Sequence, residues 1–198
     1  LDEARALARD LGIANVTFRQ GDMLDLPFDD NSFDVVFSQT VLYHIPNTEK
    51  AIAEIRRVLR PGGLVALRDA TTASLVLWPE EPLVREVWGM FSLGAQHSGG
   101  NPEVGRQLGT LLHAAGFEEV FFTLSFMQPE RPEERVEYFS RLAGAIEGDL
   151  AALAVREGWS TAERLAEGIA RLRSLANQPG SICTCPWGQA IGRKAHVR

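Results

Sequence analysis

Polar residues follow the apolar runs in the first third of the chain, and their types suit ligand binding. The group Gln20-Gly21-Asp22-Met23 comes after the β-rich run Val16-Thr17-Phe18. Asp22 could accept a hydrogen bond from an exocyclic amine, Met23 could pack on a flat ring, and the glycine lets backbone approach a ligand closely. An ordinary Asx turn at Asp22 is the structural alternative.

Small and amide side chains follow the next apolar run, which spans residues 33–37. Ser38, Gln39 and Thr40 leave main-chain carbonyl and amide groups accessible, and such groups suit an amino-acid-like part of a ligand. By themselves these three residues identify no particular ligand.

His44 is a candidate for acid–base chemistry, because an imidazole titrates near neutral pH. It follows Tyr43 and could act as a general base or contact a substrate, whereas packing and capping of a turn is the alternative. Asp69 comes just after the apolar run 64–67. We predict that it points into the same cleft; the alternative is a carboxylate in a surface loop.

The elements that must position these residues alternate between strands and helices. The runs at 33–37 and 64–67 are nearly continuous in their hydrophobicity, which indicates strands buried on both faces in a parallel sheet covered by helices. Between them a helix is predicted from Pro46 to Pro61, with Asn47 or Thr48 as its cap and Pro61-Gly62-Gly63 as its end. Open parallel α/β sheets bind ligands beyond the carboxyl ends of their strands, where the candidate residues lie.

The rest of the chain adds helices and further strands. Helices are predicted at 1–11, 83–93, 101–115, 132–146, 149–157 and 160–176, and strands at 16–18, 120–126 and within 181–194. We therefore predict a single α/β domain over residues 1–198. It would have a Rossmann-like, mostly parallel sheet with helices on both faces, and a helical insertion before the last strand.

Composition excludes several classes of partner. The net charge of −6 and the pI near 5.3 argue against nucleic acid, which is bound by surfaces rich in positive charge. No apolar run approaches the roughly 18 residues that span a bilayer, and no leader opens the chain, so we expect a cytoplasmic protein. Cys183 and Cys185 have no second ligand pair at metal-site spacing, so we expect no metal. The sequence does not determine the oligomeric state.

The combined pattern of these motifs resembles a known family. The series GDMLDLPFDDNSFDVVFSQTVLYHI followed by AIAEIRRVLRPGGLVALRD resembles class I S-adenosylmethionine-dependent methyltransferases, especially the ubiquinone/menaquinone-biosynthesis branch. The resemblance implies an enzyme that uses S-adenosylmethionine as cofactor and methylates a small molecule, most simply an apolar or aromatic one.

The resemblance also implies roles for individual residues. Asp22 matches the residue that binds the adenine amine, and Met23 its neighbour in the adenine pocket. Gln39, with Ser38 and Thr40 beside it, is expected on the methionine side of the cofactor. Tyr43, His44 and Asp69 are expected on the substrate side, with His44 as the candidate catalytic base.

The chain departs from the family pattern at its start. The family has a glycine-rich turn after its first strand and an acidic residue after its second, and both would lie before Leu1. We therefore expect an N-terminally truncated domain whose cofactor site is incomplete. Two other functions stay open, namely a non-catalytic binding module that has lost the cofactor site and a nicotinamide-dependent oxidoreductase, although the glycine fingerprint of the latter is also absent.

Two segments depart from the minimal fold, residues 71–100 and 130–179. Their aromatic content suits a lid over a small acceptor, and helix packing is the alternative explanation for any one of these aromatic residues.

Overall fold

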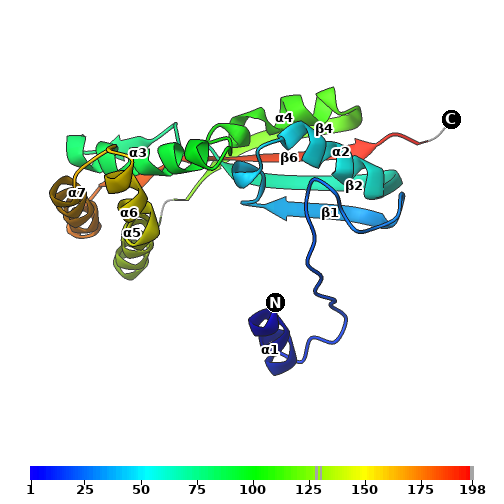
Figure 1. Ribbon diagram of the computed structural model, residues 1–198, viewed down its shortest axis with the longest axis horizontal. Coiled ribbons are helices and arrows are strands. Elements are labelled where there is room, and N and C mark those ends of the chain that lie inside the picture. Colours follow the sequence, from blue (N-terminus) through cyan, green and yellow to red (C-terminus); the bar gives the residue numbers. More distant parts are fainter. Residues whose placement is uncertain (128, 130, 197–198) are drawn as a thin grey trace.

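The computed structural model describes residues 1–127, 129 and 131–196, and Figure 1 shows the arrangement of its elements. The helices are α1 (Asp2–Asp10), α2 (Thr48–Val58), α3 (Pro82–His97), α4 (Val104–Ala114), α5 (Pro132–Ile146), α6 (Asp149–Arg156) and α7 (Ala162–Ser174), with short 3-10 helices η1 (Leu42–His44) and η2 (Leu175–Asn177). The strands are β1 (Phe33–Gln39), β2 (Leu59–Ala70), β3 (Val76–Trp78), β4 (Phe117–Phe126), β5 (Ile182–Thr184) and β6 (Pro186–Lys194).

A four-stranded sheet in the order β1-β2-β6-β4 forms the centre of the fold. β1 and β2 are parallel, whereas β6 runs antiparallel to both β2 and β4. β1, β2 and β4 therefore share one direction, which confirms the predicted α/β, Rossmann-like fold class. Because β1 and β2 are parallel, the candidate residues near their carboxyl ends lie at the same end of the strands.

Helices α2 and α4 pack on one face of this sheet. The apolar core there includes Ile52, Ile55, Leu67 and Leu108, all of which are buried. Asn47 caps α2 as predicted, because its side chain accepts a hydrogen bond from the backbone N–H of Lys50 at 2.9 Å.

α4 and β6 approach each other backbone to backbone. A Cβ atom added at Gly188 of β6 would lie 1.7 Å from the carbonyl oxygen of Gly105 in α4. Only glycine fits such a separation, so Gly188 fixes the distance between this helix and the sheet.

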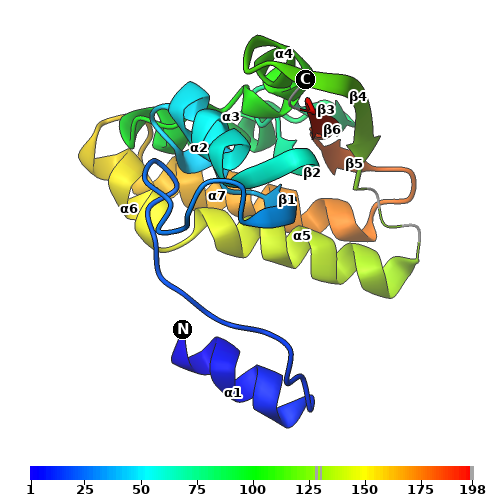
Figure 2. The same cartoon turned by 90° about the vertical axis from the view of Figure 1, so that its right-hand side faces the viewer.

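The opposite face of the sheet is open. Val35 and Phe37 of β1 are 58% and 63% exposed, and Ile191 of β6 and Phe121 of β4 are exposed as well. The prediction that the 33–37 strand is buried on both faces is wrong, because no helix among the described residues packs on this face of the sheet. In Figures 1 and 2, α1 lies beyond the edge of the sheet that β1 forms and stands apart from it.

The predicted strand at 16–18 is not formed. Residues 13–20 connect α1 to the rest of the fold as an extended linker, and Val16 is exposed. A strand needs a neighbouring strand to receive its backbone hydrogen bonds, and no described strand lies beside this segment. The predicted helix at 1–11 is present as α1.

Segments 71–100 and 131–179 come together although they are far apart in sequence, and position 130 of the predicted segment lies outside the described residues. α3 packs with α5, α6 and α7 around a separate apolar core that includes Val87, Phe139, Ile146 and Leu172. An ion pair between Glu86 of α3 and Arg164 of α7 joins the same elements. Figure 1 shows this helical unit beyond one end of the four-stranded sheet.

Several element boundaries differ from the prediction. β2 begins at Leu59, so Pro61-Gly62-Gly63 lies inside the strand, where the register with β1 shifts, rather than in a turn before it. The final strand is two strands, because β5 pairs with β3 and β6 with the main sheet. α3 continues to His97, beyond its predicted end at residue 93.

Candidate functional site

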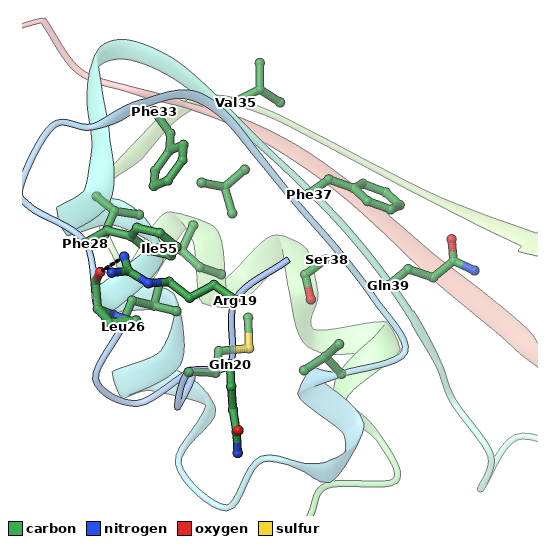
Figure 3. Close-up of a pocket in the computed structure, with 16 residues that line it drawn as sticks. Arg19, Gln20, Leu26, Phe28, Phe33, Val35, Phe37, Ser38, Gln39 and Ile55 are labelled. Carbon is green, nitrogen blue, oxygen red and sulfur yellow. Dashed lines mark hydrogen bonds between the residues drawn. The ribbon is translucent and has the colours of Figure 1, made fainter. Parts of the chain in front are cut away.

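A cavity of about 490 Å³ lies beside β1 and is bounded by the loop that precedes it (Figure 3). Its walls are mainly apolar. The lining residues are Arg19, Gln20, Gly21, Met23, Leu26, Pro27, Phe28, Phe33, Val35, Val36, Phe37, Ser38, Gln39, Val41, Ile55 and Val58. This volume falls within the range of about 300–1,000 Å³ that is typical of small-molecule sites.

Of the two residues predicted on the adenine side, Asp22 and Met23, one lines this cavity and the other does not. Met23 lines it, whereas Asp22 is exposed and is not among the lining residues. One carboxylate oxygen of Asp22 accepts the backbone N–H of Leu24 at 2.8 Å. The Asx-turn alternative therefore describes Asp22 in this structure, and the turn directs Met23 inward.

Arg57 of α2 anchors the loop wall of the cavity, a role that sequence reasoning missed. Its guanidinium donates to the carbonyl oxygens of Leu26 at 2.9 Å and Phe28 at 2.8 Å, and it also pairs with Glu54 and Asp30. Glu54 in turn accepts the backbone N–H of Leu26 at 2.9 Å. The i,i+3 spacing of Glu54 and Arg57 indicates an ion pair within α2. It does not indicate that either side chain contacts the loop.

Ser38 and Gln39 point in different directions at the end of β1 (Figure 3), and Thr40 follows them. Ser38 is buried, lines the cavity, and its hydroxyl has no hydrogen-bond partner among the described residues. Gln39 is exposed and also lines the cavity, and Figure 3 shows the two side chains diverging from β1. Thr40 has a φ of 57° and donates its backbone N–H to Arg68 at 2.9 Å, which ends the strand.

Tyr43 and His44 lie in η1, immediately beyond β1. Tyr43 is buried, and its hydroxyl donates to the carbonyl oxygen of Phe91 at 2.6 Å and lies 3.2 Å from the hydroxyl of Thr72. Burial raises the pKa of the Tyr43 hydroxyl. His44 is exposed, and its ring meets the Tyr43 ring edge-on at 4.9 Å.

Asp69 is fully buried beneath η1, so the expectation that it points into an open cleft is not met. One of its oxygens accepts the backbone N–H of Tyr43 at 3.2 Å, and the other has no partner among the described residues. Burial raises the pKa of Asp69 to about 6, although hydrogen bonds from backbone N–H groups of η1 oppose this rise. Asp69 thus holds the turn that presents His44.

No set of three or more His, Cys, Asp or Glu side chains in the described part of the chain is arranged to hold a metal ion. The two cysteines are buried and free, and burial raises the pKa of Cys183 to about 12 and that of Cys185 to about 11. These thiols therefore stay protonated at neutral pH. No helix among the described residues is long and apolar enough to cross a membrane.

The family model described as "Methyltransferase domain" matches residues 1–67. Residues 1–67 are thus similar to a methyltransferase domain. Every residue that lines the 490 Å³ cavity falls within this matched segment.

Curated proteins with similar sequences match part of the chain. An uncharacterized methyltransferase of Schizosaccharomyces pombe is 36% identical over 99 residues, which are 48% of this chain and 34% of the relative. A demethylmenaquinone methyltransferase of Lactiplantibacillus plantarum is 30% identical over 125 residues, which are 54% of this chain and 50% of the relative. The chain thus spans between a third and half of the length of these two relatives.

A solved structure extends the fold comparison to the whole chain. The YcgJ protein of Bacillus subtilis matches with a TM-score of 0.57 and 21% identity, covering 99% of this chain and 78% of that one. At this identity the match shows the fold alone. It therefore supports the α/β architecture of the elements that follow residue 67.

Proposed function

We propose that this chain forms the adenine and acceptor sides of a site that transfers a methyl group from S-adenosylmethionine to a small molecule. The observation that carries the proposal is that the segment matching the methyltransferase domain supplies all the lining residues of the 490 Å³ cavity. Enzymes with related sequences, including demethylmenaquinone methyltransferases, support the same reaction class.

The residues present fit the adenine end of this cofactor. Met23 and the apolar wall around Ile55 suit a flat ring, and the buried, unpartnered hydroxyl of Ser38 offers a polar contact to a ligand. Gln39 stands at the end of the lining that adjoins η1, where we place the methionine part. When bound, the cofactor supplies an electrophilic methyl group on its sulfonium.

The protein residues mainly need to align the acceptor and exclude water, since methyl transfer is an in-line displacement. His44, exposed in η1, is the proposed proton acceptor for a hydroxyl substrate. Asp69 and Tyr43 act behind it as positioning residues, because Asp69 holds the backbone of η1 and Tyr43 ties η1 to α3.

The acceptor is proposed to be a small apolar or aromatic molecule. Segments 71–100 and 130–179 would form its lid, which is consistent with the helical unit that these segments build together beyond the end of the sheet. The acidic net charge of −6 argues against nucleic acid, and we place the reaction in the cytoplasm.

Calorimetric titration of the chain with adenosine and with S-adenosylhomocysteine tests this proposal. Both ligands should bind, and with similar affinity, because the adenine side is present and Gly21 is the sole glycine lining the cavity among the described residues. Met23→Ala should weaken both by about tenfold, which corresponds to the loss of roughly 1.4 kcal/mol of apolar contact.

Met90→Ala provides the matched control, because Met90 lies in the core of the helical unit, away from this cavity. If the folded chain binds neither ligand saturably, the cofactor assignment is contradicted and a non-catalytic binding module is favoured. Much tighter binding of S-adenosylhomocysteine than of adenosine would show that the chain also grips the amino-acid part.

A further inference from the structure

A second cavity, of about 220 Å³, lies between α3, α5 and β6. Its lining is aromatic and apolar apart from one charged side chain. The lining residues are Trp88, Met127, Tyr138, Arg141, Leu142, Cys185 and Trp187. A dry apolar cavity of about 150 Å³ is large enough to bind benzene, so this volume accommodates a substituted benzene ring.

The polar groups of the buried aromatic walls are already used. The indole N–H of Trp88 donates to the carbonyl oxygen of Thr72 at 2.7 Å. The hydroxyl of Tyr138 donates to the carbonyl oxygen of Cys183 at 3.0 Å. Burial raises the pKa of Tyr138 to about 12, so this hydroxyl stays neutral. The aromatic walls therefore offer ring faces and edges to a ligand rather than free donors.

Arg141 supplies the one charge in the lining. Tyr138, Arg141 and Leu142 are spaced i, i+3 and i+4 along α5, which places them on one face of the helix. Among the described residues, the carboxylate paired with Arg141 is that of Glu137, at 3.8 Å, and both side chains are well exposed. This long, solvated pair leaves the guanidinium able to donate to a ligand anion.

Arg68 connects this cavity to the proposed cofactor cavity. Arg68 of β2 lies opposite Gln39 of β1 in the strand register. Its guanidinium stacks over the Trp187 ring, 4.2 Å from the ring centre. Gln39 lines the first cavity and Trp187 the second. Neighbouring strands lie about 4.8 Å apart, so the backbone positions of Gln39 and Trp187 are separated by only about 10–12 Å.

We propose that the Trp88/Trp187 cavity binds a small aromatic acid, with the ring held between the aromatic walls and the carboxylate on Arg141. The description of this ligand as the methyl acceptor rests on the proposed function. Binding itself does not, because it requires no cofactor.

A two-dimensional NMR titration of the ¹⁵N-labelled chain with 4-hydroxybenzoate, without cofactor, tests the site. The indole N–H signals of Trp88 and Trp187 should shift, whereas those of Trp78 and Trp159, which do not line the cavity, should stay in place. 4-Hydroxybenzyl alcohol has the same ring without the carboxylate, and it should bind about tenfold more weakly because it lacks a charge-assisted hydrogen bond.

Arg141→Gln should abolish this preference for the acid. Arg171→Gln is the matched control, because Arg171 forms an equally exposed i,i+4 pair with Glu167, at 4.0 Å, on α7. Leu142→Phe should weaken both ligands by filling the cavity, while it keeps both reporter tryptophans.

Three results would overturn the proposal: shifts of all tryptophan signals alike, no saturable shift at all, or a preference for the acid that survives Arg141→Gln. The failure of the cofactor titration together with a positive result here would reject methyl transfer but keep the aromatic-acid site.

Discussion

The carboxylate of Asp69 accepts the backbone N–H of Tyr43 at 3.2 Å, which ties the carboxyl end of β2 to the turn after β1. Both residues are buried, and the bond crosses from one strand end to the next. The position of the exposed His44 beside this bond therefore depends on a group that solvent does not reach.

Asp69 should give the protein a measurable dependence of stability on pH. Burial raises its pKa from 3.8 to about 6, so the folded state keeps a proton that the unfolded chain has already released. The stabilisation is complete below pH 3.8 and is lost as the pH rises to about 6. This difference of about two units between the pKa values of the unfolded and folded states corresponds to about 3 kcal/mol in the free energy of unfolding.

Urea unfolding of the wild type and of Asp69→Asn at several pH values measures this effect. The stability of the wild type relative to the variant should fall by up to about 3 kcal/mol between roughly pH 4 and pH 7. A constant difference across this range would mean that Asp69 ionises normally in the folded state.

The ion pair between α3 and α7 should show the opposite dependence. Arg164, together with the hydroxyl of Ser160, lowers the pKa of Glu86 to about 2, so the stabilisation is present above the normal value of 4.5 and is lost as the pH falls toward 2. Glu86→Gln should cost about 1 kcal/mol at neutral pH, since the pair is partly exposed, and nothing near pH 2.

Glu80→Gln is the control for Glu86, because its partner Arg85 is only five residues away and exposed. That variant should change the unfolding free energy by less than about 0.5 kcal/mol. Equal losses in the two variants would argue against a specific α3–α7 link.

The close approach of α4 and β6 predicts a severe effect for Gly188→Ala. The added Cβ would lie 1.7 Å from the carbonyl oxygen of Gly105, so the helix must move away from the sheet. We expect the loss of more than about 3 kcal/mol in thermal or urea unfolding. Gly89→Ala in α3 meets no atom within 4 Å and should stabilise by about 0.5–1 kcal/mol.

His44→Ala should separate chemistry from folding. The side chain is exposed, so unfolding should change by less than about 0.5 kcal/mol, whereas transfer to a hydroxyl acceptor should slow by about 100-fold or more at unchanged KM. His113→Ala, an exposed histidine on α4, should leave both unchanged. Unchanged turnover in His44→Ala would eliminate the base role.

The helices were predictable because their signals are local. Asn47 caps α2 and Pro132 opens α5, as the sequence indicates. Thr161 caps α7, and the hydroxyl of Ser160, just before it, donates to Glu86, which lies 74 residues away in the chain. A contact of that range leaves no local mark in the sequence.

The strands and the site depended more on partners distant in sequence. Among the described residues, Val16-Thr17-Phe18 has β-forming residues but no neighbouring strand, and Phe37 is apolar yet exposed because no helix covers its face of the sheet. Met23 and Ser38 line the cavity beside β1, whereas Asp69 is buried because η1 folds over it. Strand pairing and burial are properties of the assembled sheet, which a pattern of residue types does not specify.

The backbone contact at Gly188 also bears on how the aromatic cavity can change. Trp187 is the residue next to Gly188, so the sheet wall of this cavity is locked to α4 and tolerates little displacement. The opposite wall is the face of α5 with Arg141 and Leu142, which has no comparable backbone contact at Gly144, the glycine of that helix. Divergence toward ligands of another size or charge would therefore proceed by substitutions on α5, while the sheet wall is inherited unchanged.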